Sequence, residues 1–170
     1  MFTWYELRTT ELGVAQRFYA EVMQWDPSDP PGLFLKDGRA VAEISPLSEQ
    51  ARLRGAPVHW LGHIGVRDLD RALAPLLAAG AEPRGPTRVR GEGQVVVLCD
   101  PHGAMVALST DSSRKSAAVS WHDLHVVDAE QALALYAQIF GLQPREVLEL
   151  PQGMGAYHTF AHQPHMRPCG

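Results

Sequence analysis

The densest group of metal-binding side chains in this sequence lies near its C-terminal end. The stretch "HTFAHQPHMRPC" places His158, His162, His165 and Cys169 within twelve residues, and imidazole and thiolate groups are the usual ligands of structural zinc. A straight strand would separate His158 from His162 by about 13 Å, which is too far for one ion. A loop after Pro164 could instead gather the last three of these side chains. The spacing therefore leaves a zinc site open as one interpretation.

Other chemistry-bearing patterns are weaker. His122 and His125 in "WHDLH" fall on opposite faces of a predicted strand, so one ion cannot be bound by both. The sequence contains no Gly-rich phosphate loop of recognised spacing and no G-x-S-x-G motif. Cys99 and Cys169 form no C-x-x-C pair. The simplest interpretation is a reduced, cytoplasmic protein without structural disulfides.

Composition and net charge argue against two classes of partner, nucleic acids and membranes. The chain has 170 residues, 45% of them hydrophobic and 20% charged, as in ordinary globular proteins. Its net charge of −4 argues against a nucleic-acid partner, which usually requires a clustered basic surface. No apolar run reaches the length needed to cross a bilayer, and the N-terminus lacks the regions of a signal peptide. We therefore expect no nucleic-acid partner and no membrane association.

An internal repeat organises the elements that must position any site. "WYELRTTELGVAQRFYAEV" (4–22) returns as "WHDLHVVDAEQALALYAQI" (121–139), with five of nineteen aligned residues identical. Unrelated segments would share about one position. A weaker middle copy begins near residue 58. Because each copy would be too small to bury its own sheet face, the copies must pair.

Hydrophobic periodicity predicts the same order of elements in each copy: a strand, a helix and then further strands. In the first copy, Thr9 or Thr10 is expected to cap a helix with one buried apolar stripe, and Asp37-Gly38 predicts a hairpin. The segment 110–119 is polar and Ser-rich, as in a linker. In the third copy, "SWHDLHVV" predicts a strand, and a helix follows over 128–140 with its stop at Gly141.

Three motifs in this order give the chain a family resemblance. They are "ELRTTELGVAQRFYAEVMQW", "HWLGHIGVRDLDRALAPLLAAGAEP" and "VLCDPHGAMVAL". With them the chain resembles the vicinal oxygen chelate superfamily, which includes glyoxalase I, bleomycin-resistance proteins and extradiol dioxygenases. The resemblance implies an α+β fold of paired βαβββ modules whose sheets curl around a cup. Residues 1–110 would form a complete two-module domain, 111–118 a linker, and 119–170 a third, truncated module.

The unpaired third module leads to a prediction about assembly. An exposed sheet edge is a feature that proteins generally avoid. We therefore expect a second copy of the chain to complete this module, so that the protein is a homodimer.

The resemblance also implies where ligands of a metal would lie, namely on the first and last strand of each module. These points fall on Trp4, Glu43, Leu61 and Ala107, of which only Glu43 can bind a metal. His63 shares the face of Leu61, and Glu6 shares the face of Trp4. A divalent Zn, Ni, Mn or Fe ion held by Glu43 and His63, with Glu6 as a further ligand or as the catalytic base beside Glu43, is one hypothesis.

A cup without metal is the alternative that we favour from the sequence. Its ligand-binding residues would be Trp4, Glu6, Leu61, His63, Met105 and Ala107. Such an apolar concavity with few polar groups suits a small organic molecule. The competing hypotheses are a metal-dependent lyase, isomerase or dioxygenase, and an inactive shortened form of a four-module protein that acts only as an assembly. The sequence does not decide whether the protein is an enzyme.

Overall fold

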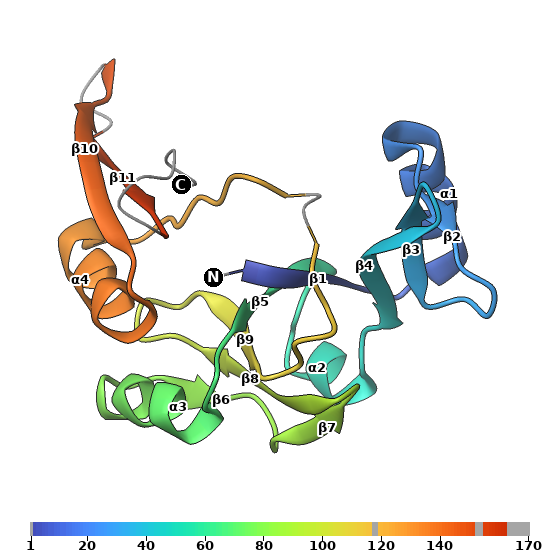
Figure 1. Ribbon diagram of the computed structural model, residues 1–170, viewed down its shortest axis with the longest axis horizontal. Coiled ribbons are helices and arrows are strands. Elements are labelled where there is room, and N and C mark those ends of the chain that lie inside the picture. The colour runs from blue at the N-terminus through green and yellow to red at the C-terminus, as the bar shows by residue number, and fades with distance from the viewer. Residues whose placement is uncertain (1, 117–118, 152–154, 163–170) are drawn as a thin grey trace.

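Two strands that pair at the centre of one sheet organise the fold, β1 (Phe2–Thr9) and β5 (His59–Gly65). The computed structural model describes residues 2–116, 119–151 and 155–162. Within these residues the main sheet has nine strands, and it is curled and open (Figure 1). β1 begins the first of two similar units and β5 begins the second. Their antiparallel pairing places the two units side by side.

The first unit follows the predicted order of a strand, a helix and further strands. Its elements are β1, α1 (Leu12–Met23), β2 (Asp26–Pro27), β3 (Leu33–Lys36) and β4 (Arg39–Pro46), followed by the short helix α2 (Glu49–Leu53). β4 returns beside β1 in parallel, and the sheet order on this side is β2-β3-β4-β1. Asp37 and Gly38 link β3 to β4 with φ angles of 51° and 73°, so the hairpin predicted from this pair is confirmed.

The second unit repeats this arrangement on the other side of β5. Its remaining elements are α3 (Leu69–Ala78), β6 (Glu82–Pro83), β7 (Arg88–Arg90), β8 (Gly93–Cys99) and β9 (Met105–Ser109). The order is β5-β9-β8-β6, with β7 also paired to β8. The α+β class and the curled mixed sheet expected from the sequence are thus confirmed.

The third unit departs from the expected pattern. It contains α4 (Ala129–Phe140) and a two-stranded sheet of β10 (Gln143–Glu149) and β11 (Ala156–Ala161). The strand predicted over "SWHDLHVV" is wrong, because residues 119–126 are irregular. In the first unit, β1 has β4 and β5 as hydrogen-bonding neighbours. Among the described strands, none pairs with residues 119–126. Because a strand without a neighbour leaves its backbone N–H and C=O groups without partners, this segment does not form one.

Helix boundaries follow local capping chemistry in the later copies. Asp68 is the N-cap of α3, and its side chain accepts a hydrogen bond from the backbone N–H group of Arg71. Asp128 caps α4 in the same way, with Gln131 as the donor. Gly141 ends α4 in a left-handed conformation, with φ of 72°. The cap predicted for α1 is wrong, because Glu11 is its N-cap and makes no side-chain capping bond. None of the helices in the described ranges is long and apolar enough to span a membrane.

The helices divide the core on the outer face of the sheet into two clusters. Under α1, Tyr5 and Phe34 pack with Trp25. Under α3 and α4, Leu76 and Leu108 pack with Tyr136, so the third unit shares the core of the second. The buried apolar stripe predicted for α1 is wrong in part: Ala15 and Tyr19 pack inward, whereas Phe18 and Val22 remain more than half exposed.

Candidate functional site

The sequence-predicted cup residues meet on the inner face of the sheet. Glu6 on β1 lies opposite Glu43 on β4 and opposite Leu61 on β5. Trp4 lies opposite His63, and His63 lies opposite Ala107 on β9. Because side chains of directly paired residues point to the same face, the strand register brings together Trp4, Glu6, Glu43, Leu61, His63 and Ala107.

This inner face is closed rather than hollow. Trp4, Glu6, Leu61, His63 and Ala107 each expose 4% of their surface or less. Beside them, Val95 and Val97 pack against Leu61 and Ala107. Met105, the remaining predicted ligand-binding residue, is 38% exposed and lines a different cavity. The predicted residues thus form a packed floor, with Met105 outside it.

A cluster of ion pairs covers this floor. Glu6 accepts hydrogen bonds from Arg90 Nη1 at 2.9 Å, from Arg8 Nη2 at 3.3 Å and from Ser45 Oγ at 2.5 Å. Its Oε2 lies 3.4 Å from His63 Nε2. Four neighbours therefore hold one buried carboxylate.

Glu43 completes the cluster at the mouth of the cup. Its Oε1 pairs with Arg90 Nη2, and its Oε2 accepts a hydrogen bond of 2.5 Å from Arg114 Nη1. The Arg114 guanidinium also lies 5.2 Å from the centre of the Trp4 ring, within the range of a cation–π contact. Arg90 thus joins two carboxylates, and Arg114 ties the second of them to the aromatic floor.

The ion pairs fix the charge state of the cluster. Burial alone would raise the pKa of Glu6, but the contact with His63 and the positive charges of Arg8 and Arg90 outweigh it, so this pKa is held well below its usual range. Burial lowers the pKa of Arg90, and the two carboxylates raise it above its usual value. At neutral pH the cluster therefore carries fixed, opposite charges.

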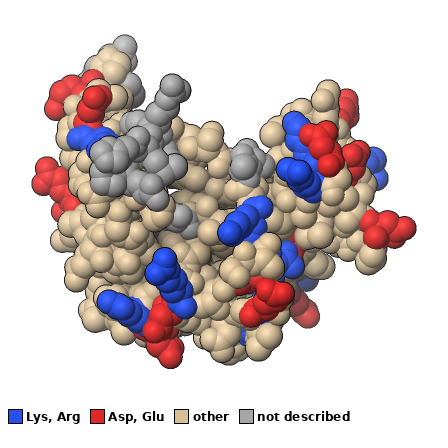
Figure 2. Space-filling model, viewed as in Figure 1, with Lys and Arg blue, Asp and Glu red and all other residues tan. Residues whose placement is uncertain are grey.

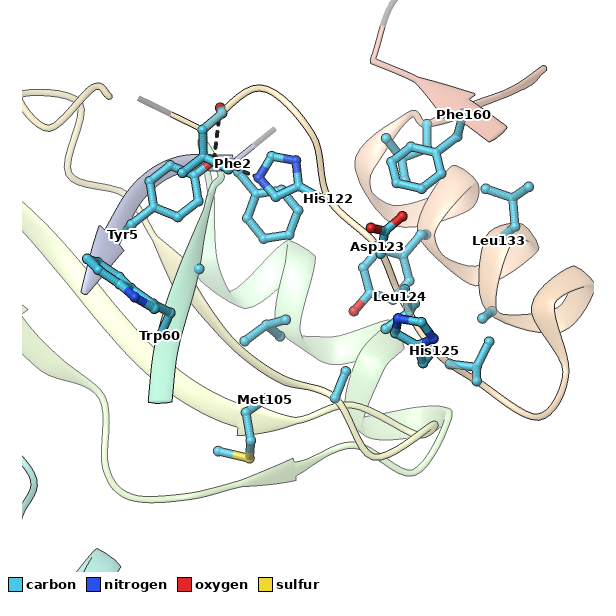
Figure 3. Close-up of a pocket in the computed structure, with 18 of the residues that line it drawn as sticks. Phe2, Tyr5, Trp60, Met105, His122, Asp123, Leu124, His125, Leu133 and Phe160 are labelled. Atoms are coloured by element: carbon cyan, nitrogen blue, oxygen red, sulfur yellow. Dashed lines mark hydrogen bonds between the residues drawn. The ribbon is translucent and has the colours of Figure 1, made fainter. Parts of the chain in front are cut away.

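A cavity lies outside the cup, on the helix-bearing side of the sheet. It has a volume of about 750 Å³. The molecule is visibly hollowed between the lobe of α1 and the lobe of α4 (Figure 2). Tyr5 and Trp60 line it from β1 and β5, and Leu133 and Phe160 from α4 and β11 (Figure 3). We call this cavity the aromatic cleft.

Polar groups of the aromatic cleft come mainly from the irregular segment 119–127. Tyr5 Oη and His122 Nε2 are 2.6 Å apart, and the imidazole stacks on the Phe2 ring with centroids 4.1 Å apart. Asp123 accepts hydrogen bonds from Tyr157 Oη and, at 3.1 Å, from Trp121 Nε1. The hydrogen bond from Tyr157 is the main cause that lowers the pKa of Asp123. Residues of the segment that was predicted to be a strand therefore line one side of the aromatic cleft.

With this geometry in place, comparison with known proteins decides the family. The model of the glyoxalase-like domain family matches residues 4–109, more than half of the chain. The chain belongs to the glyoxalase-like domain family. It is therefore a member of the vicinal oxygen chelate superfamily, and the resemblance stated from its three motifs is confirmed.

Two curated relatives extend the similarity of this glyoxalase-like chain. "Putative glyoxylase CFP32" of Mycobacterium bovis is 27% identical over 155 residues, which are 82% of this chain and 59% of that protein. "Anthracycline biosynthesis protein DauV" of Streptomyces sp. (strain C5) is 24% identical over 168 residues, covering 84% of this chain and 61% of that protein. The chain thus spans about three fifths of the length of these relatives.

A solved structure supports the fold of the glyoxalase-like chain. The Mn(II)-bound glyoxalase from Novosphingobium aromaticivorans superposes with a TM-score of 0.52 at 15% identity. The match covers 84% of this chain and 52% of that one. At this identity the likeness shows the fold alone.

The glyoxalase-like cup of this chain does not fit a divalent metal. Among the residues described, no group of three or more His, Cys, Asp or Glu side chains is placed to hold an ion. The Glu6 and Glu43 carboxylates converge, but both are bound to the Arg90 guanidinium. A cation between them would displace this group or be repelled by it.

The arginines of the cup were not predicted from the sequence. Arg90 stands on β7, and Arg114 comes from a segment interpreted only as a linker. The missed signal was electrostatic: two carboxylates facing one closed cup require nearby cations. The strand "RVR" of β7 and the "SSRKS" after β9 are the segments that supply them.

The C-terminal zinc hypothesis stays a prediction. His158 lines the aromatic cleft, and His162 lines a smaller pocket between α3 and α4. His165 and Cys169 lie outside the described residues.

Proposed function

We propose that this glyoxalase-like chain binds a small organic molecule in the aromatic cleft. The observation that carries the proposal is the cleft itself: its volume of about 750 Å³ falls in the range of ligand sites. The cup, in contrast, has a packed floor under a layer of ion pairs. The names of the curated relatives, one a glyoxylase and one an anthracycline biosynthesis protein, agree with a small-molecule ligand.

The walls of the aromatic cleft favour a ligand that contains a ring. Trp60, Tyr5 and Phe160 line it beside aliphatic residues such as Leu124 and Leu133. Aromatic side chains stabilise a bound ring through offset stacking or edge-to-face contacts. Trp60 is also oriented by its Nε1, which donates a hydrogen bond of 2.7 Å to Tyr19 Oη.

The charged side chains that line the aromatic cleft favour one sign of charge on the ligand. Of the described residues that line it, Asp123 alone carries a carboxylate, and none is Lys or Arg. Asp123 is ionised at neutral pH as an ordinary aspartate is, and the hydrogen bond from Tyr157 lowers its pKa further. A negative charge beside aromatic faces attracts a cation and repels an anion. The ligand is therefore a ring-bearing molecule that is basic or neutral.

Ligand-observed NMR with three matched sets of aromatic compounds tests this proposal. The sets carry an amine, a neutral amide or a carboxylate on the same rings. We expect saturation transfer to the amines and the amides and much less to the carboxylates. Binding that is strongest for the carboxylates, or equal across the three sets, would contradict the assigned chemistry.

A pair of tryptophan variants locates the binding. Leu124→Trp places a large ring in the cleft, and Leu53→Trp places the same ring on the exposed helix α2. Leu124→Trp is expected to weaken binding at least about tenfold, or 1.4 kcal/mol, while Leu53→Trp leaves it unchanged. An unchanged affinity in Leu124→Trp would place the ligand elsewhere.

A metal-dependent lyase, isomerase or dioxygenase is the second candidate, and it requires the Arg90 guanidinium to leave the two carboxylates that it now bridges. Its favourable observation is that Glu6, Glu43 and His63 converge on one face of the sheet. For this function, Glu43→Ala must abolish both metal uptake and turnover. Turnover that survives the substitution would reject it.

A further inference from the structure

Arg90 occupies the point at which the two inner carboxylates of the cup converge. One guanidinium nitrogen, Nη1, donates to Glu6 Oε2 at 2.9 Å, and the other, Nη2, donates to Glu43 Oε1. The carboxylates stand on neighbouring strands, β1 and β4, at paired positions. A planar guanidinium suits this bridging role because its donors are fixed in a fork.

The charges of the cluster balance. The positive charges come from Arg8, Arg90 and Arg114, and the negative charges from Glu6, Glu43 and Asp111. Removal of two arginines would leave two uncompensated negative charges. One divalent cation would neutralise them.

The second arginine comes from the connection between the second and third units. Asp111 is buried against the β7–β8 turn, where a Cβ on Gly93 would approach Asp111 N to 2.5 Å. Farther along, Ser116 N donates a hydrogen bond of 2.8 Å to Thr3 O. Between these two anchors, Arg114 reaches Glu43 and the Trp4 ring. The segment 111–116 is thus attached at both ends and presents its guanidinium to the cup.

We propose that Arg90, together with Arg114, is a built-in cation of the cup. The two guanidinium groups neutralise Glu6 and Glu43 in the place where a divalent ion would have to bind, so the chain's own side chains keep metals out. Removal of the arginines would leave Glu6 and Glu43 without the positive charges that now neutralise them, so that the two carboxylates could accept a cation in their place. This inference is independent of binding in the aromatic cleft.

The test is a titration of the full chain with Co²⁺, followed by calorimetry and by the visible absorption of the bound ion. The proteins are the wild type, Arg90→Met/Arg114→Met and Arg84→Met as the control. Arg84 pairs with the exposed Glu82, away from the cup. We expect no saturable binding by the wild type or the control. The double variant is expected to bind one ion per chain, with an affinity at least about tenfold above the detection limit that the wild type sets.

Two further variants make the result specific to the cup. Adding Glu43→Gln to the double variant is expected to remove the new site. Arg90→Lys, which keeps the positive charge, is expected to show no saturable Co²⁺ binding. Co²⁺ should also raise the thermal midpoint of the double variant and not that of the control.

Either of two outcomes would overturn the proposal. One is saturable binding of one ion per chain by the wild type, a result that needs no variant to fold. The other is a double variant with wild-type circular dichroism that binds Co²⁺ no better than the control. Neither result bears on the ligand of the aromatic cleft, which is measured without metal.

Discussion

Tyr136 on α4 donates a buried hydrogen bond of 2.9 Å to Asp100 in the turn between β8 and β9. The other Asp100 oxygen accepts from the backbone N–H groups of His102 and Ala104. One carboxylate therefore shapes the turn and also ties the third unit to the second. Burial and the neighbouring negative charge raise the pKa of Tyr136, which keeps the phenol protonated as a donor.

Replacement of Tyr136 by Phe is expected to loosen this tie. The substitution leaves Asp100 Oδ2 buried without its donor, at a cost of about 1–3 kcal/mol in the free energy of unfolding. Urea denaturation measures the loss, and Tyr157→Phe is the control because its phenol is at the surface. If both substitutions lower the free energy of unfolding equally, the buried hydrogen bond from Tyr136 contributes no more to stability than a surface one.

Replacement of Arg90 alone is expected to destabilise the cup. Arg90→Met removes one of the positive charges that stabilise the buried Glu6 carboxylate. We expect the free energy of unfolding to fall by about 2–3 kcal/mol. Arg84→Met, which breaks an exposed pair with Glu82, should change stability far less. A chemical denaturation series compares them, and a loss within 0.5 kcal/mol of zero in Arg90→Met would reject the structural role.

Acidification is expected to weaken the folded protein through Glu6. Its pKa is lowered in the folded state, so its contribution to stability is present above the ordinary glutamate pKa of about 4.3 and is lost as the pH falls below it. The slope from this one group is at most about 1.4 kcal/mol per pH unit. Glu6→Gln, less stable than the wild type at pH 7, should therefore lose less stability between pH 5 and pH 3, and parallel pH profiles of the two proteins would contradict this assignment.

Homodimerisation stays a prediction, and the third unit supplies a variant that tests it. Val147 and Leu148 on β10 are about half exposed, a property of sheet surfaces that other chains cover. If a second copy covers them, Leu148→Lys should shift sedimentation from dimer toward monomer, while Leu53→Lys on α2 should not. A wild type that sediments as a monomer at micromolar concentration would end this hypothesis.

The elements that sequence reasoning placed well are those set by local chemistry. Asp68 and Asp128 mark helix starts, and Asp37-Gly38 marks a hairpin, because each signal acts within a few residues. Strand alternation put Glu6 on the face of Trp4 and His63 on the face of Leu61, whereas the position of Glu43 was implied by the family resemblance.

The features that sequence reasoning missed depend on partners distant in the chain. Residues 119–126 repeat the pattern of β1, yet a strand also requires a neighbour to pair with. Arg114 lies 71 positions from Glu43, so its role in the cup could not be inferred from spacing. The aromatic cleft likewise forms only where β1, β5 and the third unit meet.

The central claim is that an organic molecule binds in the aromatic cleft without a metal. Chemical-shift mapping of the ¹⁵N-labelled chain, titrated with an aromatic amine in the presence of a chelator, tests it most directly. We predict shifts at the amides of cleft residues such as Gly62, Leu124 and Ala132, with little change at the cup residues Ser45 and Arg90. Shifts confined to the cup amides, or binding that disappears when the chelator is added, would contradict the claim.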